Sequence, residues 1–508
     1  MRFMEFKNPK IKKLYKYLSS MSYKAYSDPR LISNDILCKQ DSHGLILEPY
    51  LSGKMPKKAT FLFVAKKILL YFGKNLIVFL SYLVTAIAHR FSGQVFCVLE
   101  KDELLIIDTY FVARRIVERG KFDDTFFTGL AGALTRKKKY YAYVPRLVGT
   151  MNALKWFKVF RILRKNHEPV LTEFQLLEFS DYLEIVQFIL LYPFSVFRFT
   201  KALGTTEEDR ILYNGLWQRF DNVAFHGYVR FLFGRRLSIL KNNKIKCLSW
   251  YENQTLDKNF FRGLRSFSRR IDIIGAQLFV RPHGYLNIIT DEHESPFDVI
   301  PERILVNGQG YSFISDFAQV EVGPSLRNEH LFGANVNPSE GSIILVLMPA
   351  WEKVVRYILR VIDKVDWPMP VEVKFHPSAD RKLYEHALPR RFFVTEKPLP
   401  DLLLKARMVV GRGSGSQLEA AALGIPVIDI LNPDEFSHCC MPEMGRGVVW
   451  EQAINADDVA LVVSQFQKIL QADPSRLREE GTRIRSCYFS QPTDESIEKM
   501  LGLDKMKV

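Results

Sequence analysis

The spacing of apolar and polar residues divides the chain into an N-terminal helical stretch and a longer region of alternating strands and helices. Residues 1–90 are predicted to be mainly helical and basic, with aromatic residues scattered through them. From about residue 95, short apolar runs alternate with amphipathic stretches, which is the pattern of parallel sheets covered by helices. The chain is therefore expected to have an α/β fold behind a basic helical region, residues 1–95.

A first Rossmann-like unit with a helical insertion is expected over residues 96–300. Its predicted strands are Leu104–Asp108, Tyr140–Val144, Val170–Phe174, Lys244–Trp250 and Ile271–Val280. Its predicted helices are Trp156–Arg161, the aromatic stretch 182–236 and Leu256–Arg269. The unit is expected to close at the proline-containing segment near residue 300, because proline-rich turns often separate domains.

A second Rossmann-like unit is expected over residues 301–508. Its predicted strands are Arg303–Val306, Gln319–Val322, Ser342–Met348, Pro370–Phe375, Phe392–Val394, Met408–Val410 and Pro426–Ile430. Its predicted helices are Trp351–Val365, Leu399–Lys405, Ser416–Leu423 and Val459–Leu470. Two such units side by side leave a cleft between the carboxyl ends of their strands, where ligands bind.

Length and composition fit this organisation and exclude several classes of protein. The 508 residues are enough for two to four domains at about 150 residues each, and 47% apolar residues can build more than one core. The six cysteines match neither a zinc site nor a disulfide framework, which predicts reduced thiols in a cytosolic compartment. They are Cys38, Cys97, Cys247, Cys439, Cys440 and Cys487.

The net charge of +15 is concentrated in the first part of the chain. Residues 1–150 hold 26 lysines and arginines against 12 aspartates and glutamates, whereas residues 301–508 hold 24 against 28. The near-neutral C-terminal part argues against a basic groove along the whole chain, and the basic part contains no recognised RNA or DNA module. We therefore expect no nucleic acid as partner, and an anionic membrane surface or an anionic acceptor instead.

One apolar segment bears on the membrane. Residues Asn75–His89 are uncharged between Lys74 and Arg90, which is short of the roughly 20 residues that span a bilayer, so we expect a buried or interfacial helix. The lysine-rich first 20 residues do not resemble a secretory signal. The protein is expected to be cytoplasmic and peripheral, held by its basic part on the inner face of the cytoplasmic membrane.

The richest chemical motif is a glycine- and serine-containing turn that ends at Glu419, between a predicted strand and a predicted helix. Gly413 and Gly415 let the backbone approach a phosphate closely. The hydroxyls of Ser414 and Ser416 can bind that phosphate together with the amides of the helix N-terminus. Glu419 then lies where a carboxylate can accept hydrogen bonds from a ribose. The alternative is a capped turn without a ligand, with Ser416 as N-cap and Glu419 completing a capping box.

A second motif, Lys-Phe-His-Pro-Ser, starts at Lys374 and lies at the end of another predicted strand. The proline disfavours helix and holds His376 at the strand tip, on the cleft edge that also carries the serine-glycine turn. A histidine there can donate to a phosphate oxygen and stabilise the charge that leaves with it. The alternative is a structural histidine, and neighbouring strands are expected to present both motifs.

These motifs resemble those of a known enzyme class. The Lys-Phe-His-Pro segment, the Ser-Gly-Ser turn and the following Glu-Ala-Ala-Ala-Leu-Gly-Ile-Pro are similar to the His-Pro and Ser/Thr motifs of bacterial surface-polysaccharide glycosyltransferases. Capsular Kdo transferases, bacterial polysialyltransferases and teichoic acid polymerases have similar pairs. The Glu-x-x-Ala-x-Gly-x-Pro ending recurs among GT-B glycosyltransferases. The resemblance covers roughly residues 300–460.

The resemblance implies a GT-B fold with a donor nucleotide in the C-terminal unit. Lys374, His376 and the serine-glycine turn would face the donor phosphate, and Glu419 the ribose. A CMP-activated donor such as CMP-Kdo fits this subclass, which needs no metal ion or other cofactor to hold its phosphate. Arg412 inside the turn and residues 436–440 match no feature of these families, which leaves the donor open.

Two further sites are weaker. Arg327 follows a Gly-Pro turn at a strand end, similar to a Gly-x-x-Leu-Arg segment in related enzymes, and is a donor-binding candidate that can clamp a phosphate or an acceptor carboxylate; a surface salt bridge is the alternative. Glu252, between a strand and a helix, is a candidate general base that deprotonates an acceptor hydroxyl, and Asp108 competes with it. For both carboxylates the alternative is a capping or loop hydrogen bond. Gln277 and His283 are expected to line the acceptor side.

The sequence therefore predicts a glycosyltransferase that moves a sugar from a nucleotide donor to a growing surface polysaccharide or glycolipid. The expected acceptor partner is thus a glycan or a lipid-linked glycan. Two alternatives remain open at this point. One is a CDP-alditol phosphotransferase of the teichoic acid type, which uses a similar His-Pro and Ser pair. The other is a non-catalytic membrane-associated scaffold of a polysaccharide assembly complex.

Overall fold

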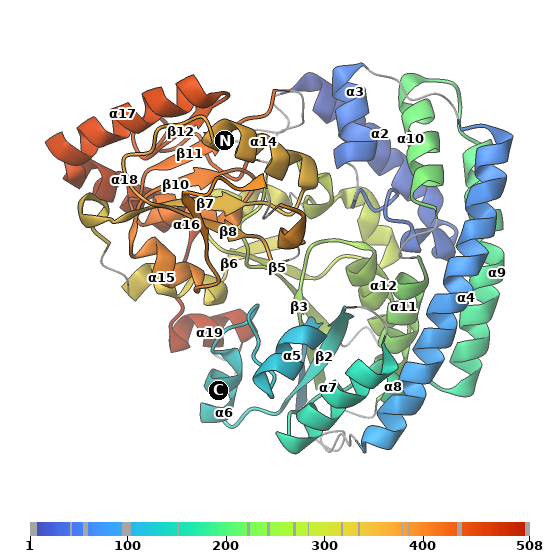
Figure 1. Cartoon of the computed structure of the whole chain (residues 1–508). Coiled ribbons are helices and arrows are strands. Elements are labelled where there is room, and N and C mark those ends of the chain that lie inside the picture. The colour runs from blue at the N-terminus through green and yellow to red at the C-terminus, as the bar shows by residue number, and fades with distance from the viewer. Residues whose placement is uncertain are drawn as a thin grey trace.

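Two parallel six-stranded sheets, each with helices packed around it, form the framework of the protein (Figure 1). The structure is a computed structural model. It describes residues 8–40, 43–53, 59–93, 103–149, 152–220, 224–240, 244–267, 271–282, 284–315, 318–333, 336–377, 379–384, 387–433 and 439–502. The predicted fold, two Rossmann-like units of the GT-B kind behind a helical N-terminal region, is confirmed by the two sheets and their parallel strand pairing.

The first sheet has the strand order β2-β1-β3-β4-β5-β6. Its strands are β1 (Glu103–Val112), β2 (Tyr141–Val148), β3 (Lys244–Trp250), β4 (Asp272–Gln277), β5 (Arg303–Val306) and β6 (Gln319–Val322). The expected boundary near residue 300 is wrong for this sheet, because β4 pairs with β5 and β5 with β6. The division between the two sheets instead lies between β6 and the next strand. The sequence could not show this, because a short apolar run does not reveal which sheet it joins.

The second sheet has the strand order β12-β11-β10-β7-β8-β9. Its strands are β7 (Ile343–Met348), β8 (Val371–Phe375), β9 (Phe392–Val394), β10 (Ala406–Gly411), β11 (Val427–Ile430) and β12 (Trp450–Ala453). The Ile-Ile-Leu-Val-Leu-Met sequence of β7 is buried at every position, as expected for a parallel strand covered on both faces. The edge strand β12 was not predicted, because only Trp450 and Ala453 of its four residues are buried.

The N-terminal region is helical and belongs to the core of the first unit. Its helices are α2 (Pro9–Tyr26), η1 (Pro29–Ser33), η2 (His43–Leu47), α3 (Glu48–Ser52) and α4 (Phe61–Ser92). The ammonium of Lys39 lies 3.2 Å from the carboxylate of Glu294, and that of Lys258 lies 2.6 Å from it; all three side chains are buried. These ion pairs fix the helical region to the elements around the first sheet.

The helices between β1 and β4 include the predicted aromatic insertion. They are α5 (Ala113–Arg119), α6 (Leu130–Arg136), α7 (Ala153–Lys165), α8 (Glu173–Leu176), α9 (Phe179–Lys201), α10 (Glu207–Gln218), α11 (Ala224–Ser238) and α12 (Thr255–Leu264). The predicted strand Val170–Phe174 is wrong: Val170 forms one isolated bridge with Tyr143, and Thr172 then caps α8 through a capping box with Gln175. The local capping chemistry therefore overrides the β-branched composition.

The remaining helices lie after β4. They are η3 (Leu286–Ile288), η4 (Glu292–Phe297), η5 (Gln309–Ile314), η6 (Leu326–Asn328), α13 (His330–Gly333), η7 (Pro338–Glu340), α14 (Glu352–Ile362), η8 (Arg381–Leu383), α15 (Leu399–Leu403), α16 (Gly415–Ala422), α17 (Ala456–Ala472), α18 (Pro474–Tyr488) and α19 (Asp494–Leu501). Helix α14 was predictable from its sequence, because the residues that it buries are apolar and recur at the helical spacing of 3.6 residues.

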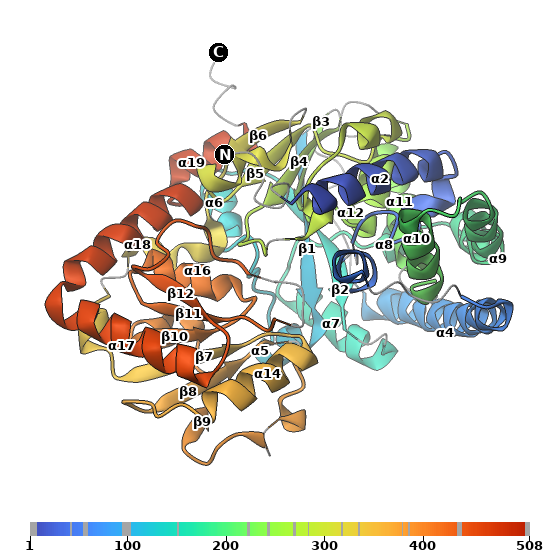
Figure 2. The same cartoon turned by 90° about the horizontal axis from the view of Figure 1, so that it is seen from above.

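The C-terminal end of the chain returns to the first unit, so residues 301–508 do not form one separate body. After α18, the backbone N–H of Ser325 donates to the carbonyl of Ser490 (2.9 Å), and the N–H of Ser490 donates to the hydroxyl of Ser325 (3.0 Å). Helix α19 then packs on the first sheet (Figure 2), where Lys246 donates to the carbonyl of Leu501 (3.0 Å) and Arg303 to that of Met500 (3.1 Å). The chain therefore crosses between the units twice.

Candidate active site

The two motifs of the second sheet lie at its carboxyl edge, on either side of β7. His376 follows β8, and its backbone N–H donates to the carbonyl of Met348 at the end of β7 (3.0 Å). The serine-glycine turn follows β10 on the other flank of β7. The expectation that neighbouring strands carry the two motifs is therefore wrong, because β7 lies between β8 and β10. Two strand spacings, about 10 Å, separate the two strands, which leaves room for a phosphate above β7.

The serine-glycine turn is a helix N-terminus formed by Ser414. Gly413 has a φ of 64°, which a residue with a Cβ adopts only with strain. The hydroxyl of Ser414 accepts a hydrogen bond from the N–H of Ser416 (3.3 Å), and Gln417 completes the capping box. The capping alternative therefore applies to Ser414 and Gln417, and not to Ser416 and Glu419. Glu419 is left with no capping role.

Gly415 marks a contact between the two units. A Cβ at this position would lie 2.9 Å from the Cβ of Val280, in the loop that follows β4 of the first sheet. No side chain fits there without moving the loop. The glycine is therefore needed for close approach of α16 to the first unit, in addition to any role toward a phosphate.

Glu419 faces the other unit rather than solvent. Its Oε2 lies 3.1 Å from Nε2 of His330 in α13, and both side chains are mostly buried. No sequence motif had pointed to His330. An acid and a histidine at this distance can share a hydroxyl of a bound ribose, which is the position that the resemblance gives to Glu419.

Arg412, which matched no family pattern, has a structural role. It is buried, and its guanidinium donates to Oδ2 of Asp429 in β11 (3.0 Å). This ion pair lies beneath the serine-glycine turn and fixes it to the neighbouring strand. Of the other unmatched segment, Cys439 and Cys440 are buried, and residues 436–438 lie outside the described part of the chain.

Lys374 is directed away from the turn. Its ammonium donates to the carbonyl of Lys397, in the loop after β9 (2.6 Å). Strand β9 lies on the outer side of β8, whereas β10 lies on the inner side. The structure therefore does not bring Lys374 together with Ser414 and Ser416.

Glu252 is held rigidly at the carboxyl edge of the first sheet, after β3. Its carboxylate accepts hydrogen bonds from the indole of Trp250 (2.9 Å) and the amide of Gln254 (2.7 Å). The next residue, Asn253, has a φ of 53° and is fixed by a hydrogen bond from its side chain to the carbonyl of Asn287 (2.7 Å). Left-handed backbone at a non-glycine residue is held only when the surroundings determine it, and such positions cluster at functional sites.

The pKa of Glu252 is raised, and burial is the largest cause. The hydrogen bond from Trp250 and the charges of Arg146 and Arg327 oppose this rise. A carboxylate with a raised pKa is a stronger base than an ordinary one. The geometry therefore suits the role of general base.

Asp108, the competing candidate, lies in a buried ion cluster. Its two carboxylate oxygens accept hydrogen bonds from the guanidinium groups of Arg146 (3.0 Å) and Arg230 (2.7 Å) and from the hydroxyl of Ser249 (2.8 Å). Burial alone would raise the pKa of Asp108, but the two arginines hold it below its ordinary value. With no exposed surface, Asp108 has no route to an acceptor hydroxyl.

The ion cluster positions Glu252 instead. Arg146 lies 2.6 Å from one oxygen of Asp257, whose other oxygen accepts a hydrogen bond from the backbone N–H of Glu252 (3.1 Å). Asp108 is thus linked to the base through Arg146 and Asp257. It is best described as a positioning residue.

We expect Asp108→Asn to lower the free energy of unfolding by about 3–5 kcal/mol, because removing one partner of a buried ion pair leaves the other charge uncompensated. Urea denaturation of the purified variant measures this loss. Asp363→Asn is the control, since Asp363 pairs with Arg391 at the surface and exposed pairs contribute about 0–1 kcal/mol. A variant of Asp108 that is as stable as the parent but inactive would return Asp108 to the catalytic role.

The two further acceptor-side predictions differ in outcome. Gln277 is buried, and its amide donates to the carbonyl of Ile288 (3.1 Å), so it fixes the loop around η3 rather than lining an open cleft. The prediction for Gln277 is therefore wrong, because the end of a strand can be covered by the loop that follows it. His283 lies outside the described residues.

Arg327 links the two sheets electrostatically. It lies in η6 after β6, is exposed, and places its guanidinium 5.6 Å from the ring centre of Phe126. Partial desolvation and then the positive charge of Arg327 lower the pKa of His376 in the second sheet. The same charge acts on Glu252 in the first sheet. Arg327 therefore lies where residues from both carboxyl edges meet.

Besides His330, three residues of this site were not predicted. Arg115, at the turn after β1, is half-buried, and desolvation together with Arg119 and Arg327 lowers its pKa. Tyr110 and Phe126 form an aromatic pair with ring centres 5.1 Å apart. The available signal for Arg115 was an Arg-Arg pair in the segment that follows the predicted strand Leu104–Asp108. Nothing in the sequence brings Phe126, from the loop after α5, to this strand end.

Within the described residues, no group of three or more histidine, cysteine, aspartate or glutamate side chains is arranged to hold a metal ion. The polar groups at the two carboxyl edges include guanidinium, imidazole, hydroxyl and backbone amide groups. These are the groups that proteins use to bind phosphate directly.

Comparison with known proteins gives similarity of overall structure only. No protein-family model and no curated sequence matches the chain. Staphylococcus aureus MnaA with UDP aligns over 80% of this chain and 99% of its own, with 11% identity and a TM-score of 0.45. A glycosyltransferase from Rickettsia africae aligns over 80% and 98%, with 12% identity and a TM-score of 0.42. The wall teichoic acid polymerase TagF aligns over 89% and 100%, with 9% identity and a TM-score of 0.39.

These likenesses are too distant to transfer any residue or activity. The GT-B-like fold of the chain is established by its own two parallel sheets and the returning C-terminal helix. Its function must be argued from the site, because one fold hosts many chemistries.

Proposed function

We propose that the protein is a glycosyltransferase that moves a sugar from a nucleotide donor to a growing surface polysaccharide or glycolipid. One observation carries the proposal: Gly415 at the N-terminus of α16, in the second unit, lies against Val280 in the loop after β4 of the first, where a Cβ on Gly415 would come within 2.9 Å of the Cβ of Val280. The carboxyl edges that carry the candidate base Glu252 and the candidate phosphate ligand His376 are thus brought close to each other. Glycosyl transfer needs this pair, since the acceptor loses a proton while the donor loses a charged nucleotide.

The donor is proposed to bind the second unit. Its phosphate lies above the end of β7, between His376 and the N-terminus of α16, where Ser414 and Ser416 contribute hydroxyls and the helix contributes amides. Helix N-termini favour anions through their unpaired N–H groups and their dipole. In this arrangement His376 stabilises the charge on the leaving nucleotide, and the protein itself supplies every phosphate contact without a metal ion or other cofactor.

The acceptor is proposed to bind the first unit. A sugar ring stacks on Tyr110 and Phe126, and its attacking hydroxyl lies beside Glu252. Arg115 and Arg327 are two like charges close to one another at this cleft edge. Such a pair favours an acidic acceptor, whose carboxylate or phosphate would neutralise both guanidinium groups. The acceptor is therefore a glycan or lipid-linked glycan that carries an acidic group.

A CMP-activated sugar such as CMP-Kdo is the donor that the motif resemblance supports. A thermal-shift screen with CMP, CDP, UDP and GDP sugars identifies the nucleotide. Mass spectrometry of products made with CMP-Kdo or CDP-glycerol then identifies the transferred group. Transfer of glycerol phosphate would establish the alditol phosphotransferase alternative. Absence of any transfer and of any nucleotide-induced shift would leave the non-catalytic scaffold.

We expect Glu419→Gln to raise the dissociation constant for the donor nucleotide about tenfold or more, with a smaller effect on kcat. A hydrogen bond from a ribose hydroxyl to a carboxylate contributes about 1.5–3 kcal/mol. Isothermal titration with the nucleotide measures the change. The control is Glu479→Gln on α18, where the side chain is exposed. Unchanged affinity would remove Glu419, and with it His330, from the ribose site.

The protein is proposed to work at the inner face of the cytoplasmic membrane, held there peripherally. The excess of 14 positive charges in residues 1–150 supports this location, because lysines near an anionic leaflet contribute about 1 kcal/mol each. A lipid-linked acceptor would be presented at the same surface.

A further inference from the structure

Helix α4 has an inverted distribution of polar and apolar residues. Six of its seven buried side chains carry a polar atom: Tyr71, Asn75, Tyr82, Thr85, His89 and Ser92. Its outward face carries large apolar side chains, among them Phe61, Leu69, Ile77 and Phe91, which are 88%, 73%, 66% and 79% exposed. A helix on a soluble domain normally buries its apolar stripe and exposes its polar one. This helix is built for an apolar environment on its outer side.

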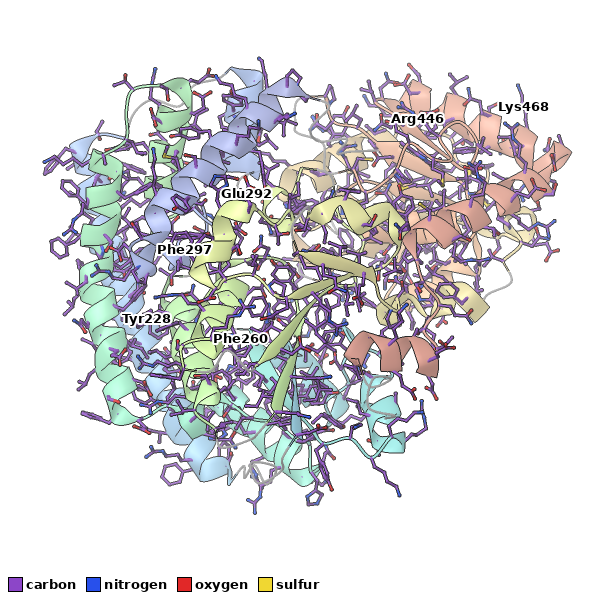
Figure 3. The ribbon with its side chains drawn as sticks, turned by 180° about the vertical axis from the view of Figure 1, so that it is seen from behind. Tyr228, Phe260, Glu292, Phe297, Arg446 and Lys468 are labelled. Atoms are coloured by element: carbon purple, nitrogen blue, oxygen red, sulfur yellow. The ribbon has the colours of Figure 1, made fainter. Side chains whose placement is uncertain are left out.

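Helix α9 extends the same face. It runs beside α4 along one edge of the molecule in Figures 1 and 2, and the rings of Tyr192 on α9 and Tyr71 on α4 stack with centres 5.6 Å apart. Its outward residues include Phe179 (78% exposed) and Phe194 (65% exposed). Figure 3 shows the pair from behind, with side chains projecting outward from that edge. We call this surface of α4 and α9 the apolar face.

The charges around the apolar face are positive. Residues 61–92 contain no aspartate or glutamate, whereas Lys66, Lys74 and Arg90 are exposed. The carboxylates of Asp181 and Glu184 on α9 turn inward and pair with Arg235 of α11 at 2.8 and 2.7 Å. A second protein would need a large apolar patch with acidic surroundings to match this surface. An anionic lipid bilayer offers both features together.

The pair lies flat against the domain instead of standing clear of it. Both helices are long and apolar enough to cross a membrane. However, α4 is anchored along its length: Lys67 donates to the carbonyl of Gln218 near its start (2.8 Å), and His89 lies 3.2 Å from the hydroxyl of Thr172 near its end. A helix of 32 residues is about 48 Å long, and crossing a bilayer would bury those protein contacts in lipid.

We propose that α4 and α9 lie in the plane of the membrane and insert the apolar face into one leaflet of an anionic bilayer. This deepens the peripheral location proposed above, and it makes attachment depend on apolar burial as well as on charge. The sequence alone suggested that Asn75–His89 forms a buried or interfacial helix; the proposed membrane face also includes the first half of α4 and the whole of α9. Membrane attachment thereby involves two helices that are 86 residues apart at their nearest ends in the sequence.

The test is flotation of the purified full chain with vesicles of phosphatidylcholine containing 30% phosphatidylglycerol. We expect Ile77→Glu/Phe194→Glu to lose at least tenfold in vesicle binding, at low and at high salt alike. The matched control is Phe393→Glu/Leu461→Glu, which changes equally exposed residues of the second unit (60% and 61%). Full binding by the α4/α9 variant would overturn the proposal.

Two further measurements separate the remaining outcomes. Tryptophans introduced singly at Leu62, Ile77 and Phe91 should show equal quenching by lipids brominated at one shallow depth, because a helix in the plane has one depth throughout. Quenching that passes through a maximum at different depths along α4 would indicate a spanning helix and overturn the proposal. A wild-type dimer in light scattering that the α4/α9 variant dissociates, without any vesicle binding, would assign the face to a second copy instead.

Two assays without vesicles, donor binding and transfer to a water-soluble acceptor, test the proposed function independently of membrane binding. The α4/α9 variant should retain both, since the apolar face contributes no residue to the cleft. Loss of vesicle binding with retained transfer supports both proposals. Vesicle binding by a wild-type protein that never transfers a sugar would leave the membrane face in place and overturn only the glycosyltransferase.

Discussion

His376→Ala is expected to reduce sugar transfer by about 30- to 1000-fold while the protein remains folded. The imidazole lies at the tip of β8, and in the proposed reaction it donates to the phosphate that leaves with the nucleotide. One hydrogen bond to a charge that develops in the transition state contributes about 2–4 kcal/mol, which gives this range of rates. The side chain is exposed, so its removal leaves no cavity.

The measurement is kcat for the identified donor, together with the melting temperature of each protein. His167→Asn is a suitable control, because His167 is exposed on the turn after α7 and has a left-handed backbone (φ of 53°) that asparagine also adopts. The control should transfer at the parent rate. Parent turnover by His376→Ala would exclude His376 from the mechanism and would leave the turn at α16 as the sole phosphate site.

Glu252→Gln is expected to lower transfer about 100-fold or more without weakening nucleotide binding. The amide keeps the shape of the carboxylate but cannot accept the proton of the acceptor hydroxyl. It also leaves the hydrogen bond from Trp250 possible, so the loop keeps its conformation. Titration calorimetry with the nucleotide and a transfer assay measure the two effects separately. An active Glu252→Gln, with an inactive but folded Asp108→Asn, would move the base to Asp108.

The pH profile gives an independent check on Glu252. Its pKa is raised by burial, so the carboxylate takes up its proton at a higher pH than an ordinary glutamate, whose pKa is about 4.3. We expect kcat/KM to fall as the pH drops through this raised pKa, and to stay level above it until another group titrates. The acidic limb should be missing from the residual activity of Glu252→Gln. A limb that persists there would belong to another group.

Most strands were predictable because their chemistry is local. The predicted strand Ser342–Met348 is almost entirely apolar, and the structure has it as Ile343–Met348. The predicted strand Lys244–Trp250, which mixes apolar and polar residues, has the same bounds in the structure. Which sheet a strand joins is decided by pairing far along the chain. For that reason β5 and β6 were assigned to the wrong unit, although their bounds were correct.

The site was predictable where one strand end carries one motif, as at His376 and the turn before α16. It was not predictable where contacts join distant segments. Glu252 and Asp108 were both predicted at strand ends, but β1 continues to Val112, so Asp108 lies inside the strand, where arginines from β2 and α11 enclose it. In the same way Lys374 precedes His376 by two residues, yet the loop after β9 draws its ammonium to the opposite flank.

The two passages of the chain between the units are bonded to each other at Ser325 and Ser490. They form a double-stranded hinge, so the donor and acceptor edges can separate only by bending both passages together or by breaking the two hydrogen bonds that join them. The two passages are therefore joined by a pair of serines that belong to neither group of candidate site residues. Their substitution would change how readily the enzyme opens to release its product, while the groups that carry out the transfer stay intact.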